Sequence, residues 1–249
     1  MLRMSVITNL DTTSWVVGNQ VISAFSEKDS KLIPESLFQW ENRIANFESV
    51  PACETYWAQM ATMQVQGSKM EFPIGLRWKR KKVAKYDAEI SHTHKNMKGE
   101  QIDGSLIVQA QFNSKVDWLS VFREACLAMR ASYALMHVFH KNETVNVRPG
   151  TSESYFLSGV LHRGTIPNIG WAVFYGEKFA GSVDVDRIAG SGFPIEKIGS
   201  GYLVRVTENL QDVVSDFPLF SKRRAELKTL FPEGFFLIKD EPLTNNPSS

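Results

Sequence analysis

The sequence is poor in the residue types that mark redox or metal chemistry. It holds two cysteines, Cys53 and Cys126, and five histidines in 249 residues. Cys126 falls on the apolar stripe of an expected helix, and Cys53 lies near an expected strand start. Two such cysteines are typical of unpaired, mostly buried thiols in a protein of a reducing compartment.

An excess of one charge and a long apolar run are also lacking. Lys and Arg number 28 against 27 Asp and Glu, so the formal net charge is +1. A protein that binds duplex nucleic acid usually has a clear basic excess, so direct nucleic-acid binding is not expected. No stretch reaches the ~20 apolar residues of a membrane span. Polar residues interrupt the first 25 positions at Asn9 and Asp11–Ser14, where a signal peptide needs an apolar core. The expected location is cytoplasmic.

The chain is rich in the apolar and aromatic residues that form a hydrophobic core. Its residues are 43% hydrophobic and 22% charged, with 16 Phe and 6 Trp. This composition is typical of a folded globular protein and excludes a disordered chain. A length of 249 residues predicts one domain over residues 1–249, and a division into lobes 1–140 and 151–240 is compatible with it. The polar segment His140–Gly150 is the strongest internal loop signal.

The periodicity of apolar residues predicts strands in runs with helices between them. A helix is predicted over Pro34–Glu48, where Leu37, Trp40, Ile44 and Phe47 recur at spacings of three and four. A second helix is predicted after an N-cap at Ser114. A third, over Leu210–Phe231, should be split by Pro218. The predicted strands are 4–8, 56–65, 72–78, 105–112, 133–139, 171–175, 202–206 and 235–238, and residues 190–201 should form a loop or tight hairpin. The fold class is therefore α+β, with mixed or antiparallel sheets, a few packed helices and room for two similar strand–helix–strand lobes.

Few residue constellations indicate chemistry. His92 and His94 would share one face of a strand, and His137 and His140 could join them. None has a carboxylate or cysteine at the tight spacing of a metal motif. The glycines of 190–201 lack the Gly-Lys-Ser/Thr of a phosphate loop, and no Gly-x-Ser-x-Gly elbow is present. No catalytic residue, cofactor or metal is therefore expected, although a hydrolase that uses His92 or His94 stays open as an alternative.

The sharpest charge feature is a basic run from Arg77 to Lys85. It could contact phosphate or an acidic partner surface, as in a nucleic-acid-binding or scaffold module. The competing interpretation is a solvated loop or a sheet edge protected by lysines, and the absence of exposed aromatic residues for base stacking favours it. The run comprises Arg77, Lys79, Arg80, Lys81, Lys82 and Lys85.

The C-terminal half contains a succession of motifs that resembles a known group of proteins. Pro167–Trp171 leads into an apolar strand and then Phe174–Gly176, followed by the glycine-rich stretch, the strand Tyr202–Thr207 and a helix with Asp212 and Val213. This succession resembles bacterial immunity proteins of polymorphic-toxin and type VI secretion systems, in particular the family called immunity protein fifty-two. The resemblance spans Gly75–Lys239 and is densest over 167–207.

The resemblance implies a cytoplasmic inhibitor without enzymatic activity that binds and neutralises a cognate effector toxin. Such toxins are often nucleases of restriction-endonuclease-like type. Because a nuclease presents cationic groups to phosphate, carboxylates should contact it, and the candidates are Glu177, Asp184 and Asp186. In extended chain, Asp184 and Asp186 would share one side. A homo-oligomer is compatible with the sequence, and a net charge of +1 requires any acidic contact face to be local.

Overall fold

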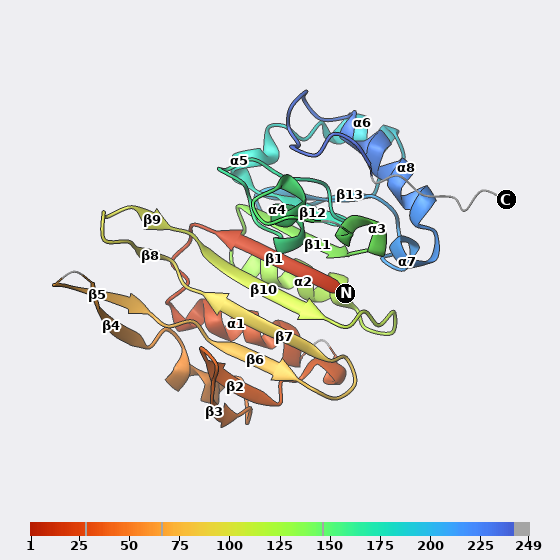
Figure 1. The fold of residues 1–249 in the computed structure, drawn as a ribbon. Coiled ribbons are helices and arrows are strands. Elements are labelled where there is room, and N and C mark those ends of the chain that lie inside the picture. Colours follow the sequence, from red (N-terminus) through yellow and green to blue (C-terminus); the bar gives the residue numbers. More distant parts are fainter. Residues whose placement is uncertain (28, 66, 146, 242–249) are drawn as a thin grey trace. The chain divides into compact units, whose positions relative to one another are not determined.

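The chain forms two compact units in a computed structural model that describes residues 1–241 except 28, 66 and 146. The N-terminal unit is Val6–Ser132. The C-terminal unit consists of Met1–Ser5 and the chain from Tyr133 onward. The strand β1 (Leu2–Thr8) therefore contributes residues to both units. Figure 1 labels the elements of each unit. The expectation of a single domain over residues 1–249 stays a prediction.

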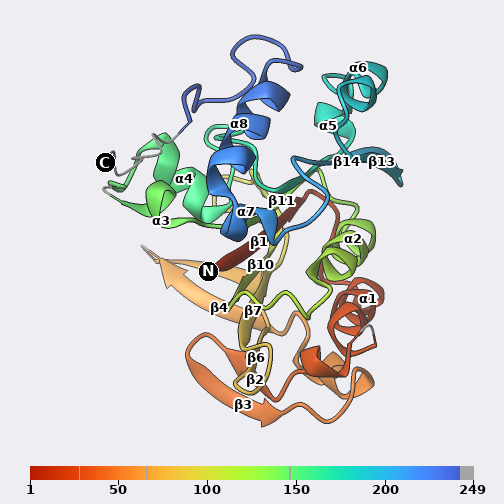
Figure 2. The same ribbon diagram turned by 90° about the vertical axis from the view of Figure 1, so that its right-hand side faces the viewer.

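The N-terminal unit contains an antiparallel sheet with helices on one face. Val6–Thr8 of β1 neighbour the first strand of this sheet. The strands, in spatial order, are β10 (Gly104–Ala110), β7 (Tyr86–Ser91), β6 (Arg77–Arg80), β2 (Ser36–Gln39) and β3 (Asn42–Asn46). The helices α1 (Trp15–Ser26) and α2 (Trp118–Ala128) pack on each other and lie on the same face of the sheet (Figure 2). Every second residue of β10 and β7 is buried, as expected for strands with one covered face.

Two small hairpins and two 3₁₀ helices complete the N-terminal unit. The hairpins are β4 (Met60–Val65) with β5 (Ser68–Pro73), and β8 (His94–Lys95) with β9 (Gln101–Ile102). The 3₁₀ helices are η1 (Ser30–Leu32) and η2 (Pro51–Tyr56). Cys53 lies in η2 rather than at a strand start, and both Cys53 and Cys126 are buried and free, which confirms the predicted unpaired thiols.

The C-terminal unit contains antiparallel strands and short helices. Its strand order is β13 (Ile195–Ile198), β14 (Gly201–Arg205), β12 (Ala172–Tyr175) and β11 (Tyr133–Val138), and Leu2–Ser5 of β1 lie beside β11. The helices are α3 (Lys141–Thr144), α4 (Ser152–Ser158), α5 (Glu177–Ala180), α6 (Val185–Gly190), α7 (Asp212–Ser215) and α8 (Phe217–Lys228). All residues of β11 and β12 are buried, which matches their continuous apolar sequences.

The predicted α+β class is confirmed, and several elements lie where periodicity placed them. The strands β10, β11, β12 and β14 fall within one or two residues of the expected ranges, and the helix α2 forms in the expected region but begins four residues after the predicted cap. The predicted cap of α2 is wrong, because Asp117 and not Ser114 accepts the Ser120 N–H, at 3.0 Å. A break near Pro218 is confirmed. It lies between α7 and α8, and Pro218 occupies the first turn of α8, where its missing N–H costs nothing.

The helix predicted over Pro34–Glu48 is wrong. This segment forms the hairpin β2–β3, in which Leu37 pairs with Ala45 and Phe38 with Arg43. The spacings of three and four that suggested a helix arise because the chain reverses direction at Trp40 and because a bulge shifts the register between Leu37 and Phe38. The predicted strand 235–238 is also not formed, and a single parallel bridge joins Ile166 to Phe236 there.

The helix α1 was not anticipated from the sequence. Ser14 caps it by accepting the Val16 N–H, and the buried residues Val17, Val21 and Phe25 recur at a spacing of four. Gly18 lies in its middle because a Cβ there would come within 2.7 Å of the ring of Trp57. None of the helices in the described part of the chain has the length and apolar character needed to cross a membrane.

Candidate functional site

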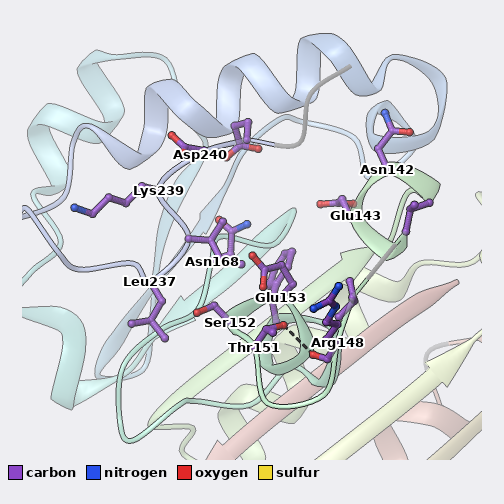
Figure 3. A pocket seen from close by; sticks show the side chains of 15 residues that line it. Asn142, Glu143, Arg148, Thr151, Ser152, Glu153, Asn168, Leu237, Lys239 and Asp240 are labelled. Atoms are coloured by element: carbon purple, nitrogen blue, oxygen red, sulfur yellow. Dashed lines mark hydrogen bonds between the residues drawn. The ribbon is translucent and has the colours of Figure 1, made fainter. Parts of the chain in front are cut away.

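The C-terminal unit contains a cavity of about 720 Å³. Its walls come from α3, the start of α4 and the segment 237–241, as Figure 3 shows. The volume lies within the range of cavities that bind small molecules or inserted side chains. The polar groups around it include Glu143, Arg148, Glu153, Asn168 and Asp240.

The short helix α3 brings its acidic residue to the cavity through its own capping. The Nδ1 atom of His140 accepts the N–H of Asn142 at 3.2 Å, and the Glu143 carboxylate accepts the N–H of His140 at 2.9 Å. The ring of His140 also stacks on Phe217 with centroids 4.2 Å apart. This reciprocal arrangement satisfies free backbone donors at the helix start and directs the Glu143 side chain inward.

Glu143 meets a fully buried arginine. Nη1 of Arg224 lies 2.7 Å from Oε1 of Glu143, and Nη2 of Arg224 lies 2.6 Å from Oε2 of Glu241. The Arg224 side chain is 0% exposed, so the two carboxylates replace the water that would otherwise solvate its charge. Lys228 pairs with the second oxygen of Glu241 at 2.6 Å. The network therefore ties α3 and the C-terminal segment to α8.

His137 extends this network into β11. Its Nδ1 accepts the backbone N–H of Trp171 at 3.1 Å, so the ring proton must be on Nε2, which donates to Glu143 at 3.0 Å. The two bonds occupy both ring nitrogens of His137 and fix the orientation of the ring. His137 thus orients Glu143 and connects it to the residue that precedes β12.

The electrostatics of Glu143 match a structural anchor. Burial acts to raise the pKa of Glu143, but the contacts with His137 and Arg224 outweigh it and lower the pKa to about 2. The carboxylate is therefore ionised at neutral pH, with both oxygens occupied by donors. A carboxylate in this state holds neighbouring elements together and is poorly suited to exchange protons near pH 7.

The remaining polar groups of the cavity lie outside this ion-pair network. Asn168 is 2% exposed, and its Oδ1 accepts the N–H of Ile169 at 2.9 Å. Arg148, Glu153, Lys239 and Asp240 are exposed, and within the described residues none of them forms an ion pair. Two positive and two negative side chains thus surround the cavity, which gives it a mixed, polar mouth.

The three carboxylates predicted to contact a partner lie outside this cavity. Glu177 begins α5, Asp184 caps α6 and Asp186 lies in the first turn of α6, and all three are exposed. Asp184 accepts the N–H of Arg187 at 3.0 Å. The expected extended arrangement of Asp184 and Asp186 is therefore wrong, because a cap followed by a helical turn replaces it. Their role in partner contact stays a prediction.

The predicted histidine pair does not form a shared face. His92 is 2% exposed, its Nδ1 donates to the carbonyl of Thr12 at 3.1 Å, and Trp57 packs edge-on at 4.9 Å. Burial lowers the pKa of His92 to about 4. His94 turns back, and its Nδ1 lies 3.0 Å from the carbonyl of His92. Across the described residues, no group of three or more His, Cys, Asp or Glu side chains could hold a metal ion.

The basic run is divided between a strand and a loop. Arg77 makes two bonds to Asp87, at 2.6 and 2.7 Å, and Lys79 pairs with the same carboxylate at 3.1 Å. These residues lie on β6, which is inside the sheet, so the expected lysine-protected edge is wrong for this part. Lys81, Lys82 and Lys85 are exposed in the loop that follows, as the solvated-loop interpretation predicts.

Sequence reasoning missed the residues that organise the cavity. The pattern His140-x-x-Glu143 is a variant of the capping box and was the one local signal available. Arg224 and Glu241 belong to segments far along the chain, and 81 residues separate Arg224 from Glu143. No spacing rule connects such residues before the fold is known.

Comparisons with known proteins give a fold but no family. No family model matches the chain, and no curated protein matches it. Among solved structures, the chain is similar to the Pseudomonas aeruginosa T6SS protein PA0821, with a TM-score of 0.62 and 10% sequence identity. The match covers 95% of this chain and 76% of that one. It shows that the two proteins share a fold. The resemblance to immunity protein fifty-two has no support from a family model.

The ion-pair network predicts that two carboxylates of the same cavity contribute very differently to the free energy of unfolding. Glu143→Gln should lower the free energy of unfolding by about 3 kcal/mol, because it breaks a buried pair and leaves Arg224 to Glu241 alone. Glu153→Gln, at an exposed position of the cavity wall, is the matched control and should change it by less than ~0.5 kcal/mol. Urea unfolding measures both, and equal midpoints for the two variants would contradict the anchoring role.

Burial of His92 predicts acid sensitivity of the N-terminal unit. The folded pKa of about 4 lies below the ordinary value of 6.5, so the unfolded chain binds more protons between these values. The contribution of neutral His92 to the free energy of unfolding should therefore be fully present above pH 6.5. Roughly 3 kcal/mol of it should be lost as the pH drops to about 4. His92→Gln should flatten this dependence, whereas His94→Gln should keep it. Thermal melts from pH 7.5 to pH 4 would test the slope, and an unchanged slope in His92→Gln would assign the effect to other groups.

Proposed function

We propose that this protein is a cytoplasmic immunity protein that binds and neutralises a cognate effector toxin of a type VI secretion system. The observation that carries this proposal is the fold similarity to a T6SS protein over 95% of the chain. The resemblance of residues 167–207 to immunity proteins points in the same direction. In the proposed mechanism, direct protein–protein contact inhibits the toxin, which is a nuclease of restriction-endonuclease-like type.

The state of the titratable groups supports binding over catalysis. Glu143, Arg224 and Glu241 occupy one another in a closed set of ion pairs, and the ring of His137 is held between two hydrogen-bond partners. Groups held in this way keep the cavity wall in one conformation. A rigid surface loses little conformational freedom on binding, which favours affinity.

The same reasoning weakens the two alternative functions. A hydrolase would need His92 or His94 as a base, but His92 is buried with its Nδ1–H used by the Thr12 carbonyl, and the Nδ1 of His94 is used by the carbonyl of His92. A nucleic-acid module would need the cations of the basic run, but Asp87 compensates Arg77 and Lys79 directly, which reduces the run to the exposed loop residues Lys81, Lys82 and Lys85. A basic group with a bound carboxylate contributes little to phosphate binding.

The experiment that tests the function is a rescue assay. The product of the neighbouring gene would be expressed in a sensitive bacterial strain with and without this chain, and the two purified proteins would be mixed for calorimetry. We expect growth to be restored and a complex of defined stoichiometry, which would also reveal a homo-oligomer. A neighbouring toxin that still kills cells in the presence of the folded chain, without binding it, would overturn the proposal.

The acidic residues of α5 and α6 predict how association depends on salt. Neutralising them together as Glu177→Gln, Asp184→Asn and Asp186→Asn should slow association with a cationic toxin, and the effect should grow as ionic strength falls. Asparagine still accepts the Arg187 N–H, so the cap of α6 and the fold should survive. The control is Asp117→Asn, an exposed cap of α2 that also keeps its bond. Rates equal to those of the control at two salt concentrations would remove this acidic surface from the interface.

A further inference from the structure

The hairpin β2–β3 has a tryptophan at its tip. Gln39 pairs with Asn42, so Trp40 and Glu41 are the two residues of the connecting loop. Trp40 has a φ of +51°, in the left-handed region that side chains rarely adopt. Two-residue loops with a positive φ at the first position strongly favour glycine there, because glycine has no Cβ to clash with the backbone. A bulky aromatic residue is among the least suitable choices for this position.

The same residue is also exposed to solvent. The Trp40 side chain is 59% exposed, whereas Trp57, Trp78, Trp118 and Trp171 are at most 6% exposed. An exposed indole forfeits the burial that normally stabilises tryptophan. Trp40 is thus unfavourable for two independent reasons, the backbone conformation and the hydration of its ring. Local rules that fail together at one surface position indicate a function of that position.

The turn does not depend on Trp40 for its shape. Nε2 of the adjacent Gln39 donates to the carbonyl of Tyr56 at 3.3 Å and to Oε1 of Gln59 at 3.0 Å. These bonds fasten the end of β2 to the chain around η2. The tip is therefore presented on a rigid support, as an anchor residue of an interface requires.

The second loop residue adds a negative charge beside the ring. The Glu41 carboxylate is 89% exposed and lies 3.2 Å from Arg77. Arg77 is already held by two bonds to Asp87, so Glu41 retains most of its capacity to accept bonds. An aromatic face next to a carboxylate suits an apolar depression with a lysine or arginine at its rim.

We propose that the Trp40–Glu41 turn is an anchor that inserts into an apolar, cation-rimmed depression on the toxin. This assignment rests on the proposed function and adds a contact in the N-terminal unit. Trp40 supplies the desolvated contact that slows dissociation, and Glu41 supplies a rim charge that speeds encounter. Charge complementarity identifies a cationic protein as the occupant.

The charge pattern argues against a second copy of this chain as the partner. In a symmetric contact the same turn would face itself and bring two exposed Glu41 carboxylates together, which is repulsive. The cavity of a second chain is an unsuitable acceptor as well. Its mouth carries Arg148, Glu153 and Asp240, whose desolvation by an indole would be unfavourable.

Stability measurements test whether Trp40 is dispensable for folding. Trp40→Gly should have an equal or higher Tm than the wild-type chain, because glycine relieves the positive φ and no buried contact is lost. The control is Val83→Ala, a similarly exposed apolar residue in the loop after β6, at the opposite end of that strand from the turn. A clear loss of Tm in Trp40→Gly would show that the residue serves the fold and would overturn the proposal.

Binding kinetics with the purified toxin test the anchor itself. Trp40→Gly and Trp40→Ala should each dissociate at least tenfold faster than the wild-type chain. Glu41→Gln should mainly slow association at low salt, and Val83→Ala should change neither rate. Wild-type rates in both Trp40 variants would overturn the anchor alone and leave the proposed function intact. A wild-type chain that does not bind the toxin would overturn the proposed function together with this assignment. Self-association that is lost in Trp40→Ala would identify a second copy as the occupant and would also overturn it.

Discussion

A guanidinium without exposed surface determines how the C-terminal unit is assembled. Arg224 belongs to α8, and its charge can be buried only if carboxylates reach it from other segments. Glu143 arrives from α3 and Glu241 from the C-terminal segment, while His137 of β11 holds Glu143 in place. The positions of two cavity walls therefore follow from compensation of a single charge.

This arrangement contributes more to specificity than to net stability. Removing two carboxylates and a guanidinium from water costs about as much as their attraction returns, so a well-packed apolar cluster could replace them. An apolar cluster would, however, tolerate small shifts of α3 along α8, whereas the ion pairs at 2.6 to 2.7 Å do not. The network thus fixes the positions of α3 and the C-terminal segment, which form two walls of the cavity.

The parts of the fold that could be predicted are those with one simple period. The strands β10 and β12 follow from alternation and from a continuous apolar run, and α2 follows from its stripe. The hairpin β2–β3 could not be recognised from the sequence. Its turn has Trp40 at the position of positive φ, where a glycine normally marks such a turn. The ion pairs of Arg224 were invisible for another reason. They join residues that only the completed fold brings together, and the sequence around each residue is ordinary.

Both units contain cationic side chains that already have carboxylate partners within the fold. On β6, Arg77 and Lys79 are compensated by Asp87, and in the C-terminal unit Arg224 is compensated by two carboxylates. A largely buried charge that already has a partner must lose that partner before it can bind another protein, which makes Arg77, Lys79 and Arg224 poor contact residues. Within the described residues, Glu177, Asp184 and Asp186 form no ion pair. Lys178 and Arg187 are exposed on the same two helices, so α5, α6 and the cap of α6 together have an excess of one negative charge, on a chain whose net charge is +1. This local excess can attract a cationic surface, although the net charge of the chain is not negative.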